Sequence, residues 1–344
     1  MTVTRATVVV GMILFVAACG GRSLPTPTDG GDGGPIDASD GGVPDAPPPA
    51  RAKSCTGGAG ADLACGAEAR DCCESRYVPG GKFLRVYDGL DNNADTWPAT
   101  VSAFYLDSFE VTVGRFRAFV QAYPGSKPQL GAGAHPKVSG SGWTGAWPLA
   151  ADGTALVAGL EDGACVDLNG TPLRTWTPAP GANERLPMMC LTWFEAFAFC
   201  AWDGGRLPTL AELNFAQAGG SEQRVYPWTT VRDYSAIDPS RAVYHGQAPF
   251  PSTPLAVGAK PLGASRWGHL DLSGNVGEVT MDRGGVLDAT CNDCVHAGSP
   301  NDAVNVLGGS WGSVAKSVAV GSVTGLGAGE RSSFSGVRCL RDVP

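Results

Sequence analysis

One pair of cysteines has the spacing of a redox-active or metal-binding thiol pair: Cys291 and Cys294 are separated by two residues, and His296 follows. In an oxidising compartment such a pair forms a local disulfide, unless a thioredoxin-like or metal-binding context surrounds it. The flanking sequence shows neither context. We therefore predict a local disulfide here, with a redox-active or metal-binding pair as the alternative.

The other residues that carry chemistry are scattered. We expect most of the four histidines to be surface or capping residues, because they stand far apart; they are His135, His245, His269 and His296. The acidic run from Asp88 to Asn93 lacks the twelve-residue pattern of a calcium-binding loop, and we interpret it as a turn. Taken alone, these residues point to no particular reaction.

Two capped helices in tandem are the best-signalled elements that position a site. Thr192 and Glu195 form a capping box, and the helix that they begin ends near Gly204. Thr209 and Glu212 repeat the capping box, and Gly219 closes the second helix.

An earlier helix is predicted to follow the strand Phe104–Val111, with Thr112 as its N-cap. Its apolar face has the spacing i, i+3, i+4, i+7 at Phe116, Phe119, Val120 and Tyr123. Elsewhere 49 Gly and 26 Pro keep the periodic stretches short. We therefore expect much irregular structure around a small sheet.

Six motifs then occur in a fixed order, and together they give a specific resemblance. The motifs are Trp193-x-x-Ala196-x-x-x-Cys200-x-Trp202, Gly205-Arg206-Leu207-Pro208-Thr209-x-x-Glu212, Tyr226-Pro227-Trp228, Asp271-Leu272-Ser273-Gly274-Asn275-Val276-Gly277-Glu278, Gly308-Gly309-Ser310-Trp311 and Gly336-Val337-Arg338-Cys339. With these motifs, the chain from Val78 to its C-terminus resembles the formylglycine-generating enzyme (sulfatase-modifying factor) family.

The resemblance implies an α+β protein with a C-type-lectin-like fold, little regular secondary structure, small antiparallel sheets and a few capped helices. It also implies a disulfide between Cys200 and Cys339. Parity and proximity in the sequence suggest a second pair, Cys165 with Cys190.

The enzymes of this family oxidise a sulfatase cysteine with O₂ and a copper(I) ion. Two thiols hold the copper, at the second and seventh positions after the aromatic residue of the Gly-Gly-Ser motif. Here those positions are Ser313 and Val318, and no cysteine lies between Trp311 and Cys339. Copper(I) prefers thiolates, so neither residue replaces the lost ligand. We expect no copper and no catalytic residues, although Ser310 is kept.

The resemblance also implies a calcium site, formed by Asp271, Gly274, Val276 and Glu278. Carboxylates and backbone carbonyls are hard oxygen ligands of the kind that calcium takes. The alternative is a turn in which Asp271 and Glu278 only hydrogen-bond the backbone.

The N-terminus predicts export. Arg5, the apolar run Val8–Val16 and Ala17-Ala18 have the form of a signal peptide over residues 1–18. Cys19 then resembles the lipidated cysteine of a bacterial lipobox, although an ordinary cleaved signal is the alternative. The run is shorter than the ~20 residues that span a bilayer.

Three further segments follow the signal. Residues 19–53 have too few large apolar residues to fold, and we interpret them as a disordered tether, with a Pro-rich recognition segment as the alternative. Residues 54–77 form a small Cys-rich cap, in which Cys72 and Cys73 are expected to bond different partners. Residues 78–344 form the main domain. The formal charge of −8 leaves no electrostatic footprint for nucleic acid.

Three functions fit this sequence. The first is a non-catalytic binding or scaffolding lipoprotein, anchored through Cys19 at the outer membrane or facing the periplasm of a bacterial cell envelope, with an envelope protein, peptide or glycan as ligand. The second is an enzyme of the resembled family, or one with altered redox chemistry that uses Cys291 and Cys294. The third is a purely structural envelope protein. We favour the first.

Overall fold

The computed structural model describes residues 48–57, 60, 63–91, 97–163, 165–246, 248, 250–284, 290–299 and 301–344. The predicted signal peptide, Cys19, nearly all of the tether, and Asn92 and Asn93 lie outside the described residues. The described residues from 48 onward belong to one compact unit. None of their helices has the length and apolar character needed to cross a membrane.

Four α-helices stand among the described residues, and two of them begin with the predicted capping boxes. Their bounds are α1 Val113–Gln121, α2 Gly153–Glu161, α3 Trp193–Trp202 and α4 Leu210–Ala218. Short 3-10 turns also occur along the described chain: η1 Lys53–Cys55, η2 Ala182–Arg185, η3 Gly220–Glu222, η4 Pro261–Gly263 and η5 Ala315–Val318.

The helix ends follow the predicted chemistry. The Thr112 hydroxyl accepts a hydrogen bond from Arg115 N. In the capping boxes Thr192/Glu195 and Thr209/Glu212, each side chain accepts a hydrogen bond from the backbone N–H of the other residue. Helix α4 ends at Gly219, whose φ of 65° is left-handed. Helix α2 was not predicted from the sequence, and only two of its side chains are buried, Leu156 and Leu160.

The strands form small sheets, so the predicted α+β class is confirmed. The sheet orders are β10-β9-β7-β11, β12-β6-β3, β4-β5-β8 and β1-β2. Two pairs, β11 with β7 and β5 with β8, are parallel, whereas only antiparallel pairing was expected. The bounds are β1 Ala64–Cys65, β2 Arg70–Asp71, β3 Ser75–Val78, β4 Gly81–Arg85, β5 Trp97–Val101, β6 Phe104–Asp107, β7 Gly277–Arg283, β8 Cys291–Asn292, β9 Val304–Leu307, β10 Val323–Leu326, β11 Ser335–Gly336 and β12 Leu340–Asp342.

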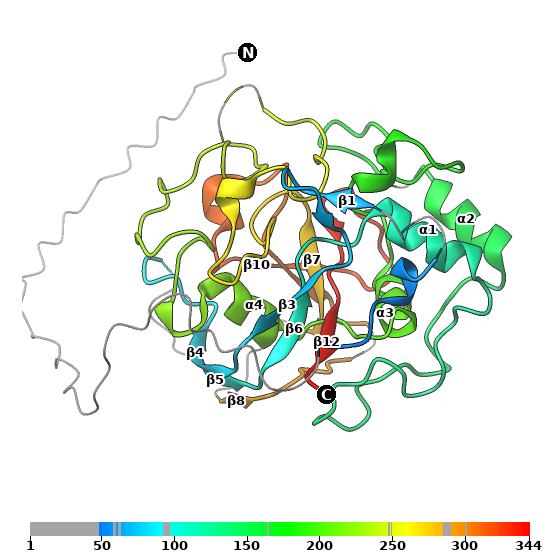
Figure 1. Ribbon diagram of the computed structural model, residues 1–344, viewed down its shortest axis with the longest axis horizontal. Helices are drawn as coiled ribbons and strands as arrows, with labels where there is room; N and C mark the ends of the chain where they lie inside the picture. The colour runs from blue at the N-terminus through cyan, green and yellow to red at the C-terminus, as the bar shows by residue number, and fades with distance from the viewer. Residues whose placement is uncertain are drawn as a thin grey trace, which may run out of the picture. The chain divides into compact units, whose positions relative to one another are not determined.

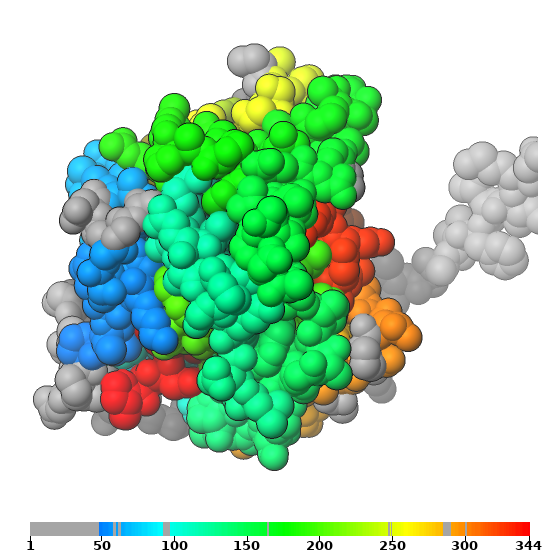
Figure 2. Space-filling view, turned by 90° about the vertical axis from the view of Figure 1, so that its right-hand side faces the viewer, coloured from blue at the N-terminus to red at the C-terminus, as the bar shows by residue number. Residues whose placement is uncertain are grey.

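The helices flank the central strands on two sides (Figure 1). Helix α4 packs against β4, β5, β7 and β9, while α1 contacts α2 and α3. The face in Figure 2 is covered largely by the segment coloured teal to green, which includes α1 and α2. Beneath it, Phe116 and Phe119 of α1 pack on Phe199 of α3, with ring centroids 5.4 and 6.0 Å away.

The N-terminal Cys-rich segment is tied to the main domain by strand pairing, and both of its disulfides lie within the segment. Strand β3 pairs with β6 of the main domain, in register from Ser75 opposite Asp107. Cys55 bonds Cys73 and Cys65 bonds Cys72, so the adjacent cysteines have different partners, as predicted. Segment 54–77 therefore shares a sheet with residues of the main domain.

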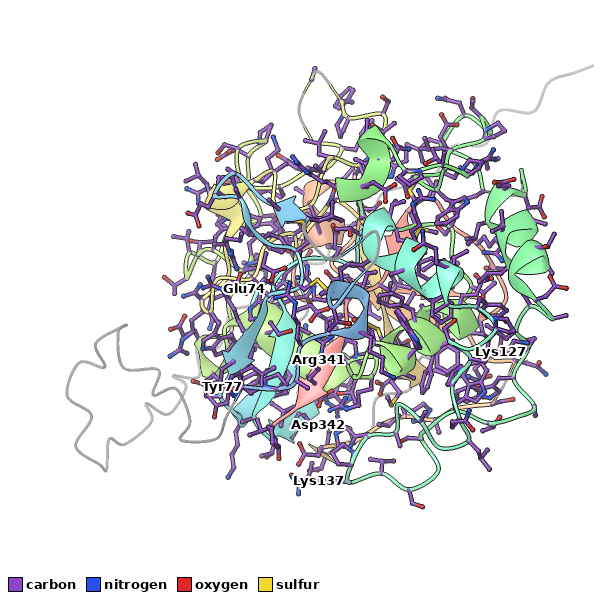
Figure 3. The ribbon with its side chains drawn as sticks, turned by 45° about the vertical axis from the view of Figure 1, so that its right-hand side comes forward. Glu74, Tyr77, Lys127, Lys137, Arg341 and Asp342 are labelled. Carbon is purple, nitrogen blue, oxygen red and sulfur yellow. A yellow bond between two sulfur atoms is a disulfide. The ribbon has the colours of Figure 1, made fainter. Side chains whose placement is uncertain are left out.

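Two arginines and two aspartates form a cluster of buried ion pairs. They come from β6, α1, the residue after α3, and β12. Arg115 of α1 donates to Asp107 at the end of β6 (2.8 Å) and to Asp203 after α3 (2.7 Å). Arg341 of β12 bonds the same two carboxylates, with 3.0 Å to Asp203. We call these four residues the buried ion quartet; Figure 3 labels Arg341, which lies on β12 beside η1.

The quartet also holds the N-terminal segment. Ser54 N donates to Asp203 Oδ1 at 2.7 Å, and Arg115 Nε donates to the Ser54 hydroxyl at 3.2 Å. Burial alone raises the pKa of the Asp107 carboxyl, but Arg115 and Arg341 outweigh burial and hold this pKa below its ordinary value. The quartet is neutral as a whole, so each charge depends on the others.

Replacing Asp203 by Asn is expected to lower the free energy of unfolding by about 3–5 kcal/mol, because it leaves buried guanidinium charge uncompensated. The matched control is Asp238→Asn, in a surface pair with Arg241 whose side chains are 48% and 37% exposed; it should cost less than about 1 kcal/mol. Urea unfolding with the disulfides intact measures both. Equal costs would contradict the role of the quartet.

The contribution of Asp107 also sets a pH dependence. Its folded-state pKa lies below the unfolded-state value of about 3.9, so its stabilising contribution is fully present above that pH. The contribution is lost as the pH falls toward the folded-state pKa. Asp107→Asn should therefore cost most near neutral pH, and the difference from the natural protein should shrink in acid.

Candidate functional site

The motif Gly308–Trp311 forms a tight turn directly after β9, and its two glycines are required by close packing. Both have positive φ, 85° at Gly308 and 61° at Gly309. A Cβ at Gly309 would lie 2.5 Å from Ser317 O and 2.8 Å from Val318 Cγ1. Only glycine combines that backbone conformation with that approach.

Trp311 fixes the turn from below. Its backbone N–H donates to Asn275 O (2.8 Å), and its indole Nε1 donates to Ser333 O (2.9 Å). The ring stacks on Phe334 with centroids 4.9 Å apart and is almost fully buried. The turn is therefore held by the two segments that lead into strands β7 and β11.

Ser313 stands at the first of the two positions where the family has thiols, and its hydroxyl is already engaged in hydrogen bonds. Ser310 N donates to Ser313 Oγ at 3.0 Å, and the two hydroxyls lie 3.2 Å apart. Ser313 N donates back to Ser310 O at 3.0 Å. Ser313 thus closes the turn on itself.

The second thiol position is an apolar core residue. Val318 ends η5 and is fully buried, in a cluster with Val225, Tyr226, Ile237, Ala242, Tyr244 and Ala319. Neither a hydroxyl bonded to Ser310 nor an isopropyl group offers copper(I) the soft ligand that it prefers. The residues at these two positions do not fit a copper(I) site.

The cysteines of the described residues are all joined in disulfides. Besides the two N-terminal pairs, the bonds are Cys165–Cys190, Cys200–Cys339 and Cys291–Cys294. These include the pair that the resemblance implied and the predicted local C-x-x-C disulfide.

The C-x-x-C loop is also anchored by the residue between its cysteines. Asp293 accepts hydrogen bonds from Ser102 N (2.6 Å) and pairs with Lys137 (2.6 Å), which Figure 3 labels. Cys291 itself lies in β8, in a different sheet from the turn. The loop thus fastens β8 to the chain around Ser102.

Exposed apolar side chains surround the turn. Leu168, Phe250 and Val314 are 59%, 54% and 54% exposed. A Cβ on Gly312 would lie 3.5 Å from Leu168 Cδ1, and Ser313 O accepts a hydrogen bond from His245 N, whose ring stacks on Phe250 at 4.1 Å. We call Leu168, Phe250 and Val314 the apolar rim.

Beneath the turn, the segment implied to bind calcium contains buried carboxylates. Asp271 Oδ2 accepts the Gly258 N–H, and Glu278 Oε1 pairs with Arg338 at 2.6 Å. Glu278 Oε2 is buried and has no hydrogen-bond partner in the described part of the chain. A third carboxylate, Glu110, accepts from Val276 N at 3.0 Å.

Three buried carboxylates lie near the buried guanidinium of Arg338. Burial raises the pKa of Glu110, Asp271 and Glu278, and repulsion by Asp271 raises those of the other two further. The Gly258 N–H, Arg338 and Lys260 only partly offset these effects. Burial, followed by Arg338, lowers the pKa of nearby His269 to about 3, so this histidine supplies no charge at neutral pH. The deficit of positive charge suits a divalent cation.

Side chains alone do not complete such a site. Within the described ranges, no three His, Cys, Asp or Glu side chains converge closely enough to hold one metal ion. A calcium ion would therefore need backbone carbonyls, which is the role that the resemblance implies for Gly274 and Val276. The residues fit that donor set.

Sequence reasoning missed Glu110, which we interpreted only as part of a strand leading into a helix. No local pattern marks it, because its partners Asn275 and Val276 lie far along the chain. Most histidines were expected to be surface or capping residues, but His135 and His269 are buried. His135 Nε2 lies 3.5 Å from buried Glu212, and His269 Nδ1 lies 3.2 Å from the Ser265 hydroxyl.

Comparison with known proteins agrees with the motifs. Residues 62–343 match the family described as sulfatase-modifying factor enzyme 1-like domain. The inactive C-alpha-formylglycine-generating enzyme 2 of Mus musculus is 32% identical, with 59% of this chain and 67% of the relative covered. The formylglycine-generating enzyme of Bos taurus is 25% identical, with 60% and 56% covered.

A solved structure shares the fold. PvdO from Pseudomonas aeruginosa aligns with a TM-score of 0.53 at 19% identity, over 77% of this chain and 93% of that chain. The predicted resemblance and the C-type-lectin-like fold are thereby confirmed. The relatives include proteins named as enzymes and proteins named as inactive.

Proposed function

The chain belongs to the sulfatase-modifying factor enzyme 1-like family, and from this premise we propose that it is a non-catalytic binding or scaffolding protein. The observation that carries the proposal is the state of the two thiol positions. Ser313 is bonded to Ser310, and Val318 is sealed in an apolar cluster. The scaffold is kept while the copper ligands are replaced.

The apolar rim supports binding at the same place. Leu168, Phe250 and Val314 expose large apolar side chains around a rigid turn, and exposed apolar groups gathered in one place mark interaction sites. Because the turn is already rigid, less conformational entropy is lost when a ligand binds. Among the ligand classes of envelope protein, peptide and glycan, this rim best suits an apolar peptide segment.

The location is part of the proposal. The apolar run Val8–Val16 followed by Cys19 supports export and lipid anchoring at a bacterial cell envelope. The five disulfides agree with an oxidising compartment. The alternative function is an enzyme, since relatives of similar identity are named as enzymes.

We also propose a structural calcium ion, held by Asp271 and Glu278 with the carbonyls of Gly274 and Val276. The support is the excess of buried negative charge and the unpartnered Glu278 Oε2. Bound calcium would supply positive charge beneath the turn and hold the segment that carries Asn275, the acceptor for Trp311 N.

Two experiments test the proposed function: an activity assay and a pull-down. With O₂, copper and a sulfatase-type cysteine peptide, the protein should form no aldehyde detectable by mass spectrometry. In pull-downs from native envelopes, Phe250→Ser with Val314→Ser should lose partners that the natural protein captures, because the rim loses its apolar surface. Leu130→Ser, at a side chain 81% exposed elsewhere, is the matched control. Aldehyde formation, or capture unchanged by the rim variants, would sink the proposal.

Calcium is tested by thermal unfolding. At pH 7, saturating Ca²⁺ should raise the melting temperature by about 5 °C, and EGTA should reverse the rise. The folded-state pKa values of Asp271 and Glu278 are raised, so without calcium these groups favour the fold in acid and weaken it as the pH rises. Protons compete with calcium for these carboxylates, so the shift should shrink as the pH falls.

The control variants separate this site from general ionic effects. Asp271→Asn should abolish most of the calcium shift, whereas Asp238→Asn, at an exposed pair, should keep it. A shift that is absent in the natural protein, or that is equal in both variants, would show that no such site exists.

A further inference from the structure

Arg283, the last residue of β7, has its guanidinium enclosed by aromatic rings. Its Cζ lies 3.9 Å from the ring centroid of Trp193 and 5.0 Å from that of Trp147. The two rings meet edge to face at 4.9 Å, and the Trp193 indole donates to Thr280 O at 2.7 Å. The rings are therefore fixed, and the side chain of Arg283 is only 4% exposed.

Within the described part of the chain, the charge of this arginine is only partly matched. Its Nη2 is buried and has no hydrogen-bond partner among the residues that the structure describes. Burial lowers its pKa, and attraction by Asp302 opposes that only in part. Asp302 Oδ2 instead accepts a hydrogen bond from Ser299 N at 2.6 Å.

A small pocket opens beside this guanidinium. Its volume is about 160 Å³, and its walls include Trp147, Trp193, Met281 and Val295, with Ser141 at the edge. The Ser141 hydroxyl is already used, because it donates to Val138 O and accepts from His135 N. The pocket thus combines apolar walls with one unsatisfied cation.

We propose that the Arg283 pocket binds a carboxylate on a short apolar stem, either a free short-chain acid or the acidic side chain of a peptide. A guanidinium stacked on a ring by its face keeps its N–H edge free, and that edge matches the two oxygens of a carboxylate. The apolar walls receive the methylene stem.

Size and polarity define the ligand further. The pocket is smaller than the roughly 300 Å³ at which sites for whole drug-sized ligands begin, so it admits only an end group. A phosphate dianion needs more donors than one guanidinium edge offers, and burying it without them is costly. The site also lies apart from the turn, because the six residue steps of β7 from Gly277 to Arg283 span roughly 20 Å.

Arg117 is a second buried arginine that lies over a tryptophan ring, and its guanidinium has a carboxylate partner. Arg117 is 3% exposed and lies over Trp176 at 4.4 Å, but its guanidinium pairs with Glu184 at 2.7 Å. The aromatic stacking is common to both residues. Among the described residues, Arg117 has a carboxylate paired with its guanidinium, whereas Arg283 has only the more distant Asp302; Arg117 is therefore the matched control.

The test titrates the full chain with butyrate and with uncharged butyramide, and follows tryptophan fluorescence and melting temperature. Butyrate should bind with a dissociation constant on the order of 1 mM, and butyramide about tenfold or more weakly. Acetyl-glutamate amide and acetyl-glutamine amide repeat the comparison for a peptide side chain. Binding of butyrate alone would indicate a free acid as ligand, and binding of both acids an acidic side chain.

Variants at Arg283 and Arg117 distinguish a loss of ligand binding from a loss of stability. Arg283→Met should abolish butyrate binding and keep or raise the melting temperature, because it removes a buried charge that is only partly matched. Arg117→Met should lower the melting temperature and keep butyrate binding. Arg283→Lys, which keeps the charge and loses the fork, should bind butyrate more weakly. Equal binding of acid and amide by the natural protein, or no binding of either, would overturn the proposal without any variant.

Discussion

The buried ion quartet is the constraint on which the rest of the structure depends. Asp107, Arg115, Asp203 and Arg341 join β6, α1, the end of α3 and the C-terminal strand without access to water. The Cys200–Cys339 disulfide ties α3 to the C-terminal segment a few residues from the quartet. That segment carries the supports of the site: Ser333 and Phe334 hold Trp311, and Arg338 pairs with Glu278.

Under the proposed function, the site departs from the family's thiol pair at two side chains, Ser313 and Val318. The turn keeps its glycines and its buried tryptophan, and the helices keep their capping boxes. Ser313 and Val318 are each stabilised where they stand, one by hydrogen bonds and the other by apolar packing. A scaffold without the thiol pair can still present a rigid, partly apolar surface.

The sequence predicted those features whose causes are local or carried by ordered motifs. Capping boxes need only four residues, so α3 and α4 were found, and the motif at Cys339 identified its partner Cys200. Helix α2 was not predicted, because its apolar residues form only a weak helical pattern. Glu110 and Arg283 escaped because their environments are made by residues distant in the sequence, which no local pattern records. The parallel strand pairs escaped for the same reason.

The central claim is that the side chains at positions 313 and 318 alone separate this protein from a copper-binding site. The most direct measurement is a copper(I) titration, in competition with a chelator, of the natural protein and of the double variant Ser313→Cys with Val318→Cys. Cysteine is close in size to both residues, so the scaffold should accept it. We predict no specific copper(I) binding by the natural protein and one bound ion per chain in the variant. Stoichiometric binding by the natural protein, or none by the variant, would contradict the account.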